Sequence, residues 1–179
     1  MNKANSTLLG ALLLLTTFGP GCDVHLLPDT GVDAGGQSTR LEVSLGSIGA
    51  ETLGDEVEGV RLTIVDVLAH NEMDDTWIIL NAREVQLDLL ATTRSDLSKE
   101  FPVAIGGYDR IMVVLSGAAV LHNDTWQPAT VKQMEVELNG NFLINEGSDL
   151  QIDFDLFGAL LRSPSEGWSF EPRILAYVS

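Results

Sequence analysis

The sequence predicts an all-β domain, an antiparallel β-sandwich that spans residues 39–179. From residue 39 onward, apolar residues recur at every second position in several segments, which is the period of a strand with one buried face. Turn-forming clusters such as Gly106-Gly107 and Asn139-Gly140-Asn141 separate these segments. Short strands of this kind bury their apolar faces by packing two sheets together. We therefore expect a sandwich of the immunoglobulin-like or prealbumin-like kind, with at most one short helix.

The alternating segments define the expected strands and their core-facing residues. In chain order these residues are Leu41, Val43 and Leu45; Val60, Leu62 and Ile64; Val85, Leu87 and Leu89; Ile111, Val113 and Leu115; Met134, Val136 and Leu138; Leu150, Ile152 and Phe154; and Phe170, Ile174, Ala176 and Val178. Val65 and Val67 add apolar residues to the opposite face of the strand that holds Ile64.

Two local features depart from this plain pattern of strands and turns. The segment from Leu90 to Lys99 is the only plausible helix, because Ser95 can cap a short helical turn and Asp96 would lie near its positive end. We expect one or two helical turns there. Tyr108 begins the most apolar strand, and we expect its hydroxyl to bond back to a nearby backbone group, as in the tyrosine corner of sandwich domains.

Residues 1–21 have the layout of a secretory signal peptide. Lys3 precedes an apolar run over residues 8–18 that is too short to span a bilayer as a helix, and small residues then lead to Cys22. This ending resembles the lipobox of bacterial lipoproteins, in which the cysteine receives a diacylglyceryl group, although residues 19–20 depart from the usual pattern. The alternatives are an ordinary cleaved signal that leaves a chance cysteine, and an uncleaved membrane anchor.

Residues 22–38 contain turn formers and no sustained apolar period, so we expect a flexible tether between a lipid on Cys22 and the domain. The chain has a net charge of −16 and a single cysteine. An acidic surface lacks the clustered Lys and Arg that phosphate binding requires, which argues against nucleic acid as a partner. Together these features predict an exported protein, lipid-anchored to a membrane of the bacterial cell envelope, in the periplasm or at the cell surface.

Two similar segments carry the candidate ligand-binding residues. Each follows an apolar strand and runs from His-Asn to Asp-Thr-Trp, over residues 70–77 and 122–126. We expect both turns at one end of the sandwich, which requires their strands to be parallel. Histidine and carboxylates could then bind Zn²⁺ or Ca²⁺, or the two tryptophans could stack on a sugar. The candidates are His70, Asp74, Asp75, Trp77, His122, Asp124 and Trp126.

These patterns also have a structural explanation. Asn and Asp favour turns for their own backbone reasons, and each tryptophan can pack beside its strand. Asp153 and Asp155 share one face of a strand and could form a glycosidase pair, but neighbouring carboxylates on a strand are more often plain surface. The common nucleophile-elbow, zinc-protease and nucleotide-binding motifs do not occur in the sequence. We therefore predict no catalytic residue, no metal centre and no cofactor.

Six short motifs follow one another along the domain. They are VRLTIVDVLAH at residues 60–70, TWIIL at 76–80, LDLL at 87–90, GGYDRIMVVL at 106–115, IDFD at 152–155 and FEPRI at 170–174. In this order they resemble a family of bacterial lipoprotein domains that is catalogued only as a domain of unknown function. The Asp-Ala-Pro that commonly follows the first strand in that family is replaced here by LGSIGAE at residues 45–51. The resemblance implies a β-sandwich on an exported, lipid-anchored chain, and it implies no known activity.

The expected function is that of a non-catalytic envelope lipoprotein, which acts as a binding or structural module. Its expected partners are the membrane, through the N-terminal lipid, and a carbohydrate or an envelope protein. The alternatives are a calcium-dependent or carbohydrate-binding adhesion module and, less favoured, a hydrolase.

Overall fold

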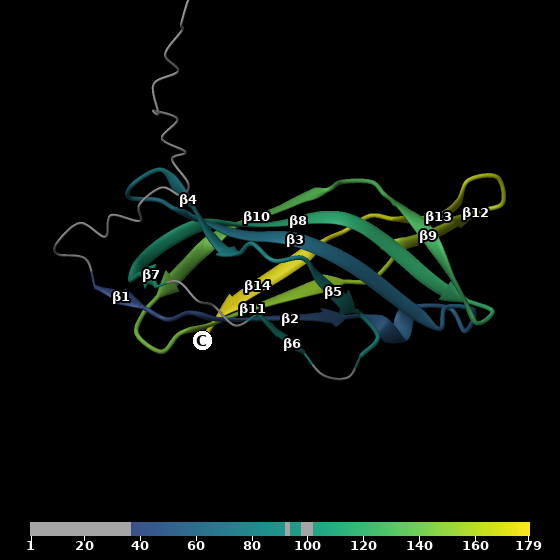
Figure 1. The fold of residues 1–179 in the computed structure, drawn as a ribbon, viewed down its shortest axis with the longest axis horizontal. Helices are drawn as coiled ribbons and strands as arrows, with labels where there is room; N and C mark the ends of the chain where they lie inside the picture. Colours follow the sequence, from purple (N-terminus) through teal and green to yellow (C-terminus); the bar gives the residue numbers. More distant parts are fainter. Residues whose placement is uncertain (1–36, 92–93, 98–101) are drawn as a thin grey trace, which may run out of the picture. The chain divides into compact units, whose positions relative to one another are not determined.

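Two β-sheets packed face to face form the part of the chain that the computed structural model describes, residues 37–91, 94–97 and 102–179 (Figure 1). The larger sheet follows the order β12 (Leu160–Ser163), β13 (Gly167–Phe170), β9 (Thr125–Val131), β8 (Gly106–His122), β3 (Gly59–Asn71) and β4 (Thr76–Asn81), with β10 (Glu135–Ile144) paired to β8 and β5 (Val85–Asp88) paired to β3. The smaller sheet follows the order β14 (Ile174–Val178), β11 (Asp149–Asp155), β2 (Glu42–Ile48) and β6 (Ser95–Leu97). β1 (Ser38–Thr39) pairs only with β7 (Val103–Ala104), and η1 (Ala50–Thr52) is a single 3₁₀ turn. The prediction of an all-β sandwich is confirmed.

The predicted signal peptide and Cys22 lie within residues 1–36, outside the described residues. Among the residues that are described, no helix is long and apolar enough to cross a membrane.

The sheets are mixed, because two of the strand pairings are parallel. β2 runs parallel to β11, from Glu42 opposite Asp149 to Ile48 opposite Asp155, and β13 runs parallel to β9. Parallel neighbours cannot be joined by a tight turn and need a long connection. β2, the first strand of the smaller sheet along the chain, therefore lies beside β11, which comes from the C-terminal part of the chain.

The expected alternation of apolar residues is confirmed for most of the core. Leu45, Leu62, Ile111 and Ile152 come from four different strands and are all fully buried between the sheets. Met134 is an exception, since it is 45% exposed and lies just before β10 begins.

A β-bulge changes which face the later residues of β3 occupy. Ile64 and Asp66 pair with two consecutive residues of β8, which leaves Val65 as an extra residue. Because one extra residue reverses the alternation, Val67 points into the core and is fully buried. The prediction that Val67 faces away from the side of Ile64 is therefore wrong.

The segment from Leu90 to Lys99 does not form the expected helix where it is described. Ser95–Leu97 is strand β6, which pairs antiparallel with β2. Leu97 packs into the core, with 4% of its surface exposed. Burial of this leucine and pairing at the sheet edge outweigh the local capping signal of Ser95, because propensity is a weak prior beside tertiary contacts. Residues 92–93 and 98–101 lie outside the described residues.

Tyr108 occupies a tyrosine corner, as the sequence predicts. Its hydroxyl donates a 2.9 Å hydrogen bond to the carbonyl oxygen of Ala104, four residues upstream, and its side chain is buried. Burial raises the pKa of the Tyr108 phenol, so the hydroxyl keeps the proton that it donates. This bond fastens the short connection between β7 and the long strand β8.

Replacement of the tyrosine hydroxyl tests this role. Tyr108→Phe should lower the free energy of unfolding by about 1–2 kcal/mol, because the carbonyl of Ala104 loses its partner while the ring remains. Tyr177→Phe is the matched control at a side chain that is 54% exposed, and it should change stability by less than about 0.5 kcal/mol. Urea unfolding followed by tryptophan fluorescence measures both, and equal effects of the two substitutions would contradict the assignment.

Candidate functional site

The two candidate turns lie at opposite ends of the domain. β3 and β8 are antiparallel, with Gly59 opposite Leu121 and Asn71 opposite Tyr108. The turn after β3 therefore lies beside the start of β8, and the turn after β8 lies beside the start of β3. β3 has 13 residues, so at about 3.3 Å per residue the turns are roughly 40 Å apart. The prediction of a shared site is wrong, because the strands that lead into the turns are not parallel.

The turn between β3 and β4 is organised by Asn71. Its side-chain oxygen accepts hydrogen bonds from the backbone N–H groups of Met73, at 2.9 Å, and Asp74, at 3.3 Å. Asp75 adopts a left-handed conformation with φ of 49°, which Asp tolerates better than most residues. The Asn and Asp residues of this turn therefore serve its backbone geometry.

His70 lies buried between two carboxylates at this end of the domain. Its Nδ1 is 2.6 Å from Asp109 Oδ1, and its Nε2 is 3.2 Å from Asp75 Oδ1. The contact of Nδ1 with Asp109 is a hydrogen bond, which the ring donates because an ionised carboxylate can only accept, and the contact of Nε2 with Asp75 is an ion-pair distance. Both ring nitrogens of His70 therefore face carboxylates of the protein itself.

A bulge in β8 brings Asp109 to the histidine. His70 pairs with Arg110 and Asn71 pairs with Tyr108, which leaves Asp109 as the extra residue. The hydrogen bond from His70 lowers the pKa of the Asp109 carboxyl below its usual range. The bulge thus places a charged residue of an apolar strand next to the buried His70.

Trp77 and Arg110 complete this cluster. The ring of Trp77 meets His70 edge-on, with 5.0 Å between ring centres, and the guanidinium carbon of Arg110 lies 5.0 Å from the centre of the Trp77 ring. Arg110 also approaches Asp109 Oδ1 at 3.7 Å and Glu137 Oε1 at 3.9 Å. The tryptophan is held by these neighbours, so it packs beside its strand as the structural explanation requires.

The turn between β8 and β9 has a similar sequence and a different chemistry. Asn123 and Asp124 both have positive φ, 49° and 56°, which makes a two-residue type I′ hairpin turn between His122 and Thr125. His122 Nδ1 lies 2.8 Å from the carbonyl oxygen of Glu56, and its Nε2 lies 3.1 Å from Asn123 Nδ2. The carbonyl needs a donor and the amide nitrogen needs an acceptor, so these contacts fit a neutral ring protonated on Nδ1.

Trp126 is also engaged by its neighbours. It lies against Gly59, where an added Cβ would be 3.0 Å from the indole, and the guanidinium carbon of Arg61 lies 4.1 Å from a ring centre. The backbone N–H of Asp124 donates to Glu58 Oε2 at 3.1 Å. Across the described part of the chain, no three His, Cys, Asp or Glu side chains gather closely enough to hold a metal ion.

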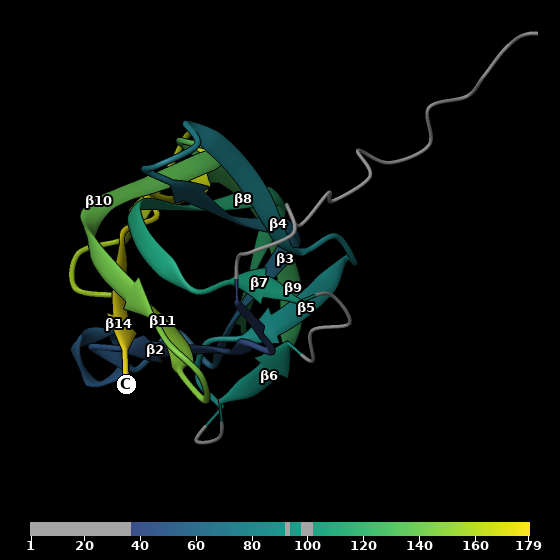
Figure 2. The same ribbon diagram turned by 90° about the vertical axis from the view of Figure 1, so that its left-hand side faces the viewer.

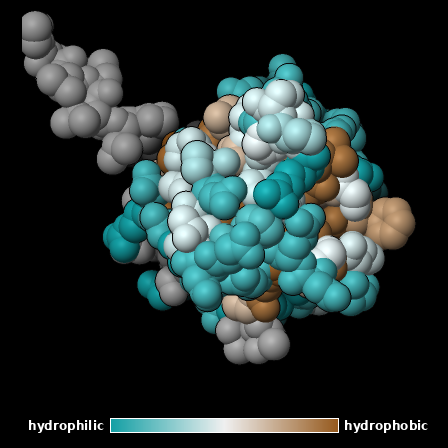
Figure 3. Space-filling view, turned by 90° about the vertical axis from the view of Figure 1, so that its right-hand side faces the viewer, coloured by the Kyte–Doolittle hydropathy of each residue, from teal (hydrophilic) through white to brown (hydrophobic). Residues whose placement is uncertain are grey.

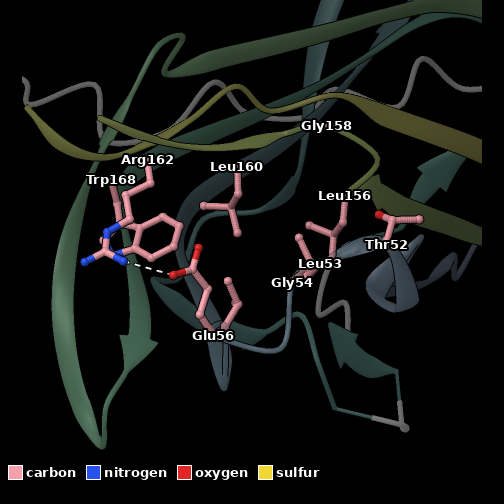
Figure 4. A pocket seen from close by; sticks show the side chains of 10 residues that line it. Thr52, Leu53, Gly54, Glu56, Leu156, Gly158, Leu160, Arg162 and Trp168 are labelled. Carbon is pink, nitrogen blue, oxygen red and sulfur yellow. Dashed lines mark hydrogen bonds and ion pairs between the residues drawn. The ribbon is translucent and has the colours of Figure 1, made fainter. Parts of the chain in front are cut away.

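Next to His122 is a small cavity of about 150 Å³, which Figure 4 shows from close by. Leu53, Leu156 and Leu160 contribute apolar walls, and an ion pair of 2.9 Å between Arg162 and Glu56 lies at its side. The surface at the β12–β13 end of the domain is mostly hydrophilic, with hydrophobic residues along one side (Figure 3). The cavity is therefore a small apolar hollow beside charged groups that already satisfy each other.

Trp168 also lines this cavity and packs edge-on against His122, with 5.8 Å between ring centres. Its indole nitrogen is buried and has no hydrogen-bond partner among the described residues. A buried donor without a partner costs on the order of 1–3 kcal/mol, which the surrounding apolar contacts must offset.

A larger concave surface lies between β10 and β14, which run side by side (Figure 2). This surface, which we name the β10–β14 groove, is open to solvent, has a volume of about 540 Å³ and is lined by residues 138–143 and 175–178. Leu143 and Tyr177 are 58% and 54% exposed on it. Apolar side chains of this size are usually buried, so a concave surface that exposes two of them is a candidate binding surface.

The carboxylates weighed as a glycosidase pair have structural contacts. Asp153 is buried, with Oδ1 2.8 Å from Arg94 Nη2 in an ion pair that lacks the alignment of a hydrogen bond. Gly46 makes room for this pair, because an added Cβ would lie 2.7 Å from the same oxygen. Asp155 Oδ1 accepts the backbone N–H of Phe157 at 2.9 Å. The interpretation of Asp153 as plain surface is therefore wrong, since Arg94 covers it.

Several residues that shape these sites were missed by the sequence analysis. Asp109 carried a signal, because it is a charged residue at the start of the most apolar strand. Leu143 and Tyr177 carried none, because their exposure depends on which strands lie at the sheet edges.

The dependence of the unfolding free energy on pH, measured in the acid range, tests the contact between His70 and Asp109. A carboxyl whose pKa is lowered in the folded state adds stability above its ordinary value of about 3.9, and this contribution is lost as the pH falls through the lowered pKa. The stability difference between wild type and Asp109→Asn should therefore be largest above about pH 5 and shrink on acidification. Urea unfolding from about pH 2 to pH 6 measures it.

Asp124→Asn, at the other turn, is the control for this experiment. Its side chain is exposed, and its stability difference from wild type should be small and nearly constant over the same pH range. If the difference in unfolding free energy between Asp109→Asn and wild type stays constant down to about pH 2, the contact between His70 and Asp109 does not contribute to stability.

Comparison with known proteins assigns a family to the chain and adds no activity. No curated protein and no solved structure matches the chain. A family model described as a domain of unknown function, DUF4382, matches residues 42–172. This match covers most of the chain, from β2 to the residues before β14. The chain therefore belongs to the DUF4382 family of domains of unknown function.

Proposed function

We propose that this chain is a non-catalytic lipoprotein of the bacterial cell envelope. In this proposal a lipid on Cys22 tethers it to a membrane, residues 22–38 act as a flexible tether, and the sandwich binds an envelope component. The layout of residues 1–22 supports the anchor, since a short apolar run followed by small residues and a cysteine is typical of lipoprotein signals.

The observation that carries the binding role is the β10–β14 groove. It exposes Leu143 and Tyr177 in a concavity of about 540 Å³, whereas the cavity beside Glu56 holds only about 150 Å³. A binding surface needs apolar area that a partner can remove from water, and the groove offers it. The polar groups of the two turns support a structural role for those segments instead, because both ring nitrogens of His70 and of His122 already contact polar groups of the protein.

The anchor is tested by removing its acceptor. Cys22→Ser should move the protein from the membrane fraction to the soluble fraction or leave it unprocessed, because the lipid is attached through the thiol. Fractionation followed by intact-mass measurement of the mature wild-type chain checks this. A wild-type mass without any added lipid would exclude the lipoprotein assignment.

The binding role is tested by crosslinking in intact cells. A photoreactive phenylalanine analogue at position 177, in the groove, should yield a discrete crosslinked species with an envelope component. The control places the same analogue at position 79, because Ile79 is 51% exposed on β4 at the other edge of the larger sheet. Equal crosslinking at both positions, or none at position 177, would contradict a binding role for the groove.

A further inference from the structure

We infer that the β10–β14 groove binds an uncharged carbohydrate, a short run of neutral sugar residues that lies along the line where the two sheets meet. This inference rests on the proposed binding role of the groove and names the class of its ligand. Its support comes from the arrangement of the side chains around the groove, the lack of charge among the residues that line it, and the close approach of β10 to β14.

The groove has an apolar floor and an exposed rim on each of its two strands. Ala176 pairs with the buried Ile152 of β11, and Phe142 is itself buried, so both residues point toward the core and form part of the floor. Tyr177 and Leu143, the next residues along these strands, are exposed, because side chains alternate between the two faces of a strand. A ligand in the groove therefore meets an aromatic ring on one rim and an aliphatic side chain on the other.

Two asparagine amides are the polar side chains on the β10 rim. Asn139 and Asn141 both line the groove and are exposed on either side of Gly140. Residues 139–142 lie opposite residues 108–110 of β8, so β10 carries one extra residue in a β-bulge at this place. Within the described part of the chain, neither amide has a side-chain hydrogen bond to another residue. Each amide can both donate and accept, which is also what a sugar hydroxyl does.

Gly140 allows an aromatic ring to lie between these two amides. A Cβ added at position 140 would lie 2.5 Å from Cζ of Phe142, so the Phe142 ring occupies the space that a side chain there would fill. Small-molecule sites are mostly lined by apolar and aromatic side chains, with a few polar groups that fix the orientation of the ligand. Sugar rings match such a lining, because their C–H faces pack on apolar surface while their hydroxyls bond to polar groups.

The charge of the lining decides which chemical class fits. None of the residues at 138–143 and 175–178 carries a charge, and a charged group that leaves water without a partner is penalised. The neighbouring acids Glu137 on β10 and Asp149 on β11 also disfavour an anion. An acyl chain would cover the two amides without offering them a hydrogen bond. An uncharged ligand with both apolar faces and hydroxyl groups meets neither penalty.

The spacing of the two strands excludes an added polypeptide strand. Cα atoms of β10 lie within 8 Å of Cα atoms of β14, whereas a strand inserted between them would need about 4.8 Å on each side, or roughly 9.6 Å in all. A ligand that lies over the groove needs no such separation. The volume of about 540 Å³ is within the range of roughly 300–1,000 Å³ that is usual for small-molecule sites. A second copy of the chain is disfavoured by the net charge of −16.

Binding of matched oligosaccharides to the full chain tests the inference. The neutral probes are tetramers of glucose, mannose and N-acetylglucosamine, and the charged probes are tetramers of glucosamine and glucuronate, all with the linkage found in cellulose. At least one neutral tetramer should bind, and both charged tetramers should bind at least about tenfold more weakly, because the groove offers no partner for their charges. NMR titration of the isotope-labelled chain up to about 10 mM ligand measures the affinities and maps the residues whose signals shift. Equal binding of a charged tetramer, or no binding of any neutral one, would overturn the inference.

Variants of the chain locate the binding. Tyr177→Ala should weaken binding of the best neutral tetramer by about tenfold or more, because it removes the aromatic ring, whereas Tyr177→Phe should keep most of the affinity. The double variant Asn139→Ala with Asn141→Ala should weaken binding by about fivefold or more, because it removes hydrogen-bond partners.

Phe157→Ala is the matched control for the loss of an exposed aromatic ring. Phe157 is 66% exposed in the connection between β11 and β12 and does not line the groove, so this variant should bind as wild type does. Thermal unfolding of each variant checks that it folds. Equal binding by Tyr177→Ala and Phe157→Ala would overturn the inference, because the sugar would then bind elsewhere.

The remaining outcomes separate this inference from the proposed function. A crosslinked species at position 177 that proves to be a polypeptide or a lipid would support the binding role and overturn the carbohydrate. Concentration-dependent dimerisation that Tyr177→Ala abolishes would identify a second copy as the occupant and would also overturn it. Binding of a neutral tetramer without crosslinking in cells would support the ligand class and contradict the proposed role in the envelope. Loss of both results would refute both.

Discussion

The antiparallel ladder between β3 and β8 is the interaction on which the rest of the domain depends. β3 has 13 residues and β8 has 17, and together they form the centre of the larger sheet (Figure 1). β4 and β5 pair with β3, while β9 and β10 pair with β8. A two-stranded ribbon is marginal alone, and these neighbours supply the additional ladders and the buried face that stabilise it. The tyrosine corner at Tyr108 fixes where this long ladder begins.

The direction of this ladder also explains why two similar sequences acquire different chemistry. The antiparallel pairing sends the turns after β3 and β8 to opposite ends, where different segments surround them. At one end His70 meets the carboxylates of Asp75 and Asp109. At the other end His122 meets the backbone carbonyl of Glu56 and the side chain of Asn123. The local sequence therefore determined the turns, and tertiary contacts determined the partners of each histidine.

Periodicity predicted the fold well because strands alternate their side chains with a period of two. The core residues of most strands follow directly from that rule, and the tyrosine corner follows from the position of Tyr108. The rule fails where a bulge inserts a residue, as at Val65, because no residue type marks a bulge in advance. The rule also cannot show that Ser95 belongs to strand β6 and does not cap a helix, because β6 pairs with β2, which is distant in the sequence. The β10–β14 groove was missed for the same reason, because the topology of the whole fold determines which strands lie at the sheet edges.

The acidity of the chain and the edges of its sheets have to be considered together. A net charge of −16 keeps copies of the protein apart through long-range repulsion, and this protection does not require a charge on every edge strand. The strand β14 carries no charge in its sequence ILAYV, whereas β6 carries Asp96 and β12 carries Arg162. Because β10 runs beside β14 without pairing to it, a neighbouring strand and the net charge of the chain together protect this uncharged edge.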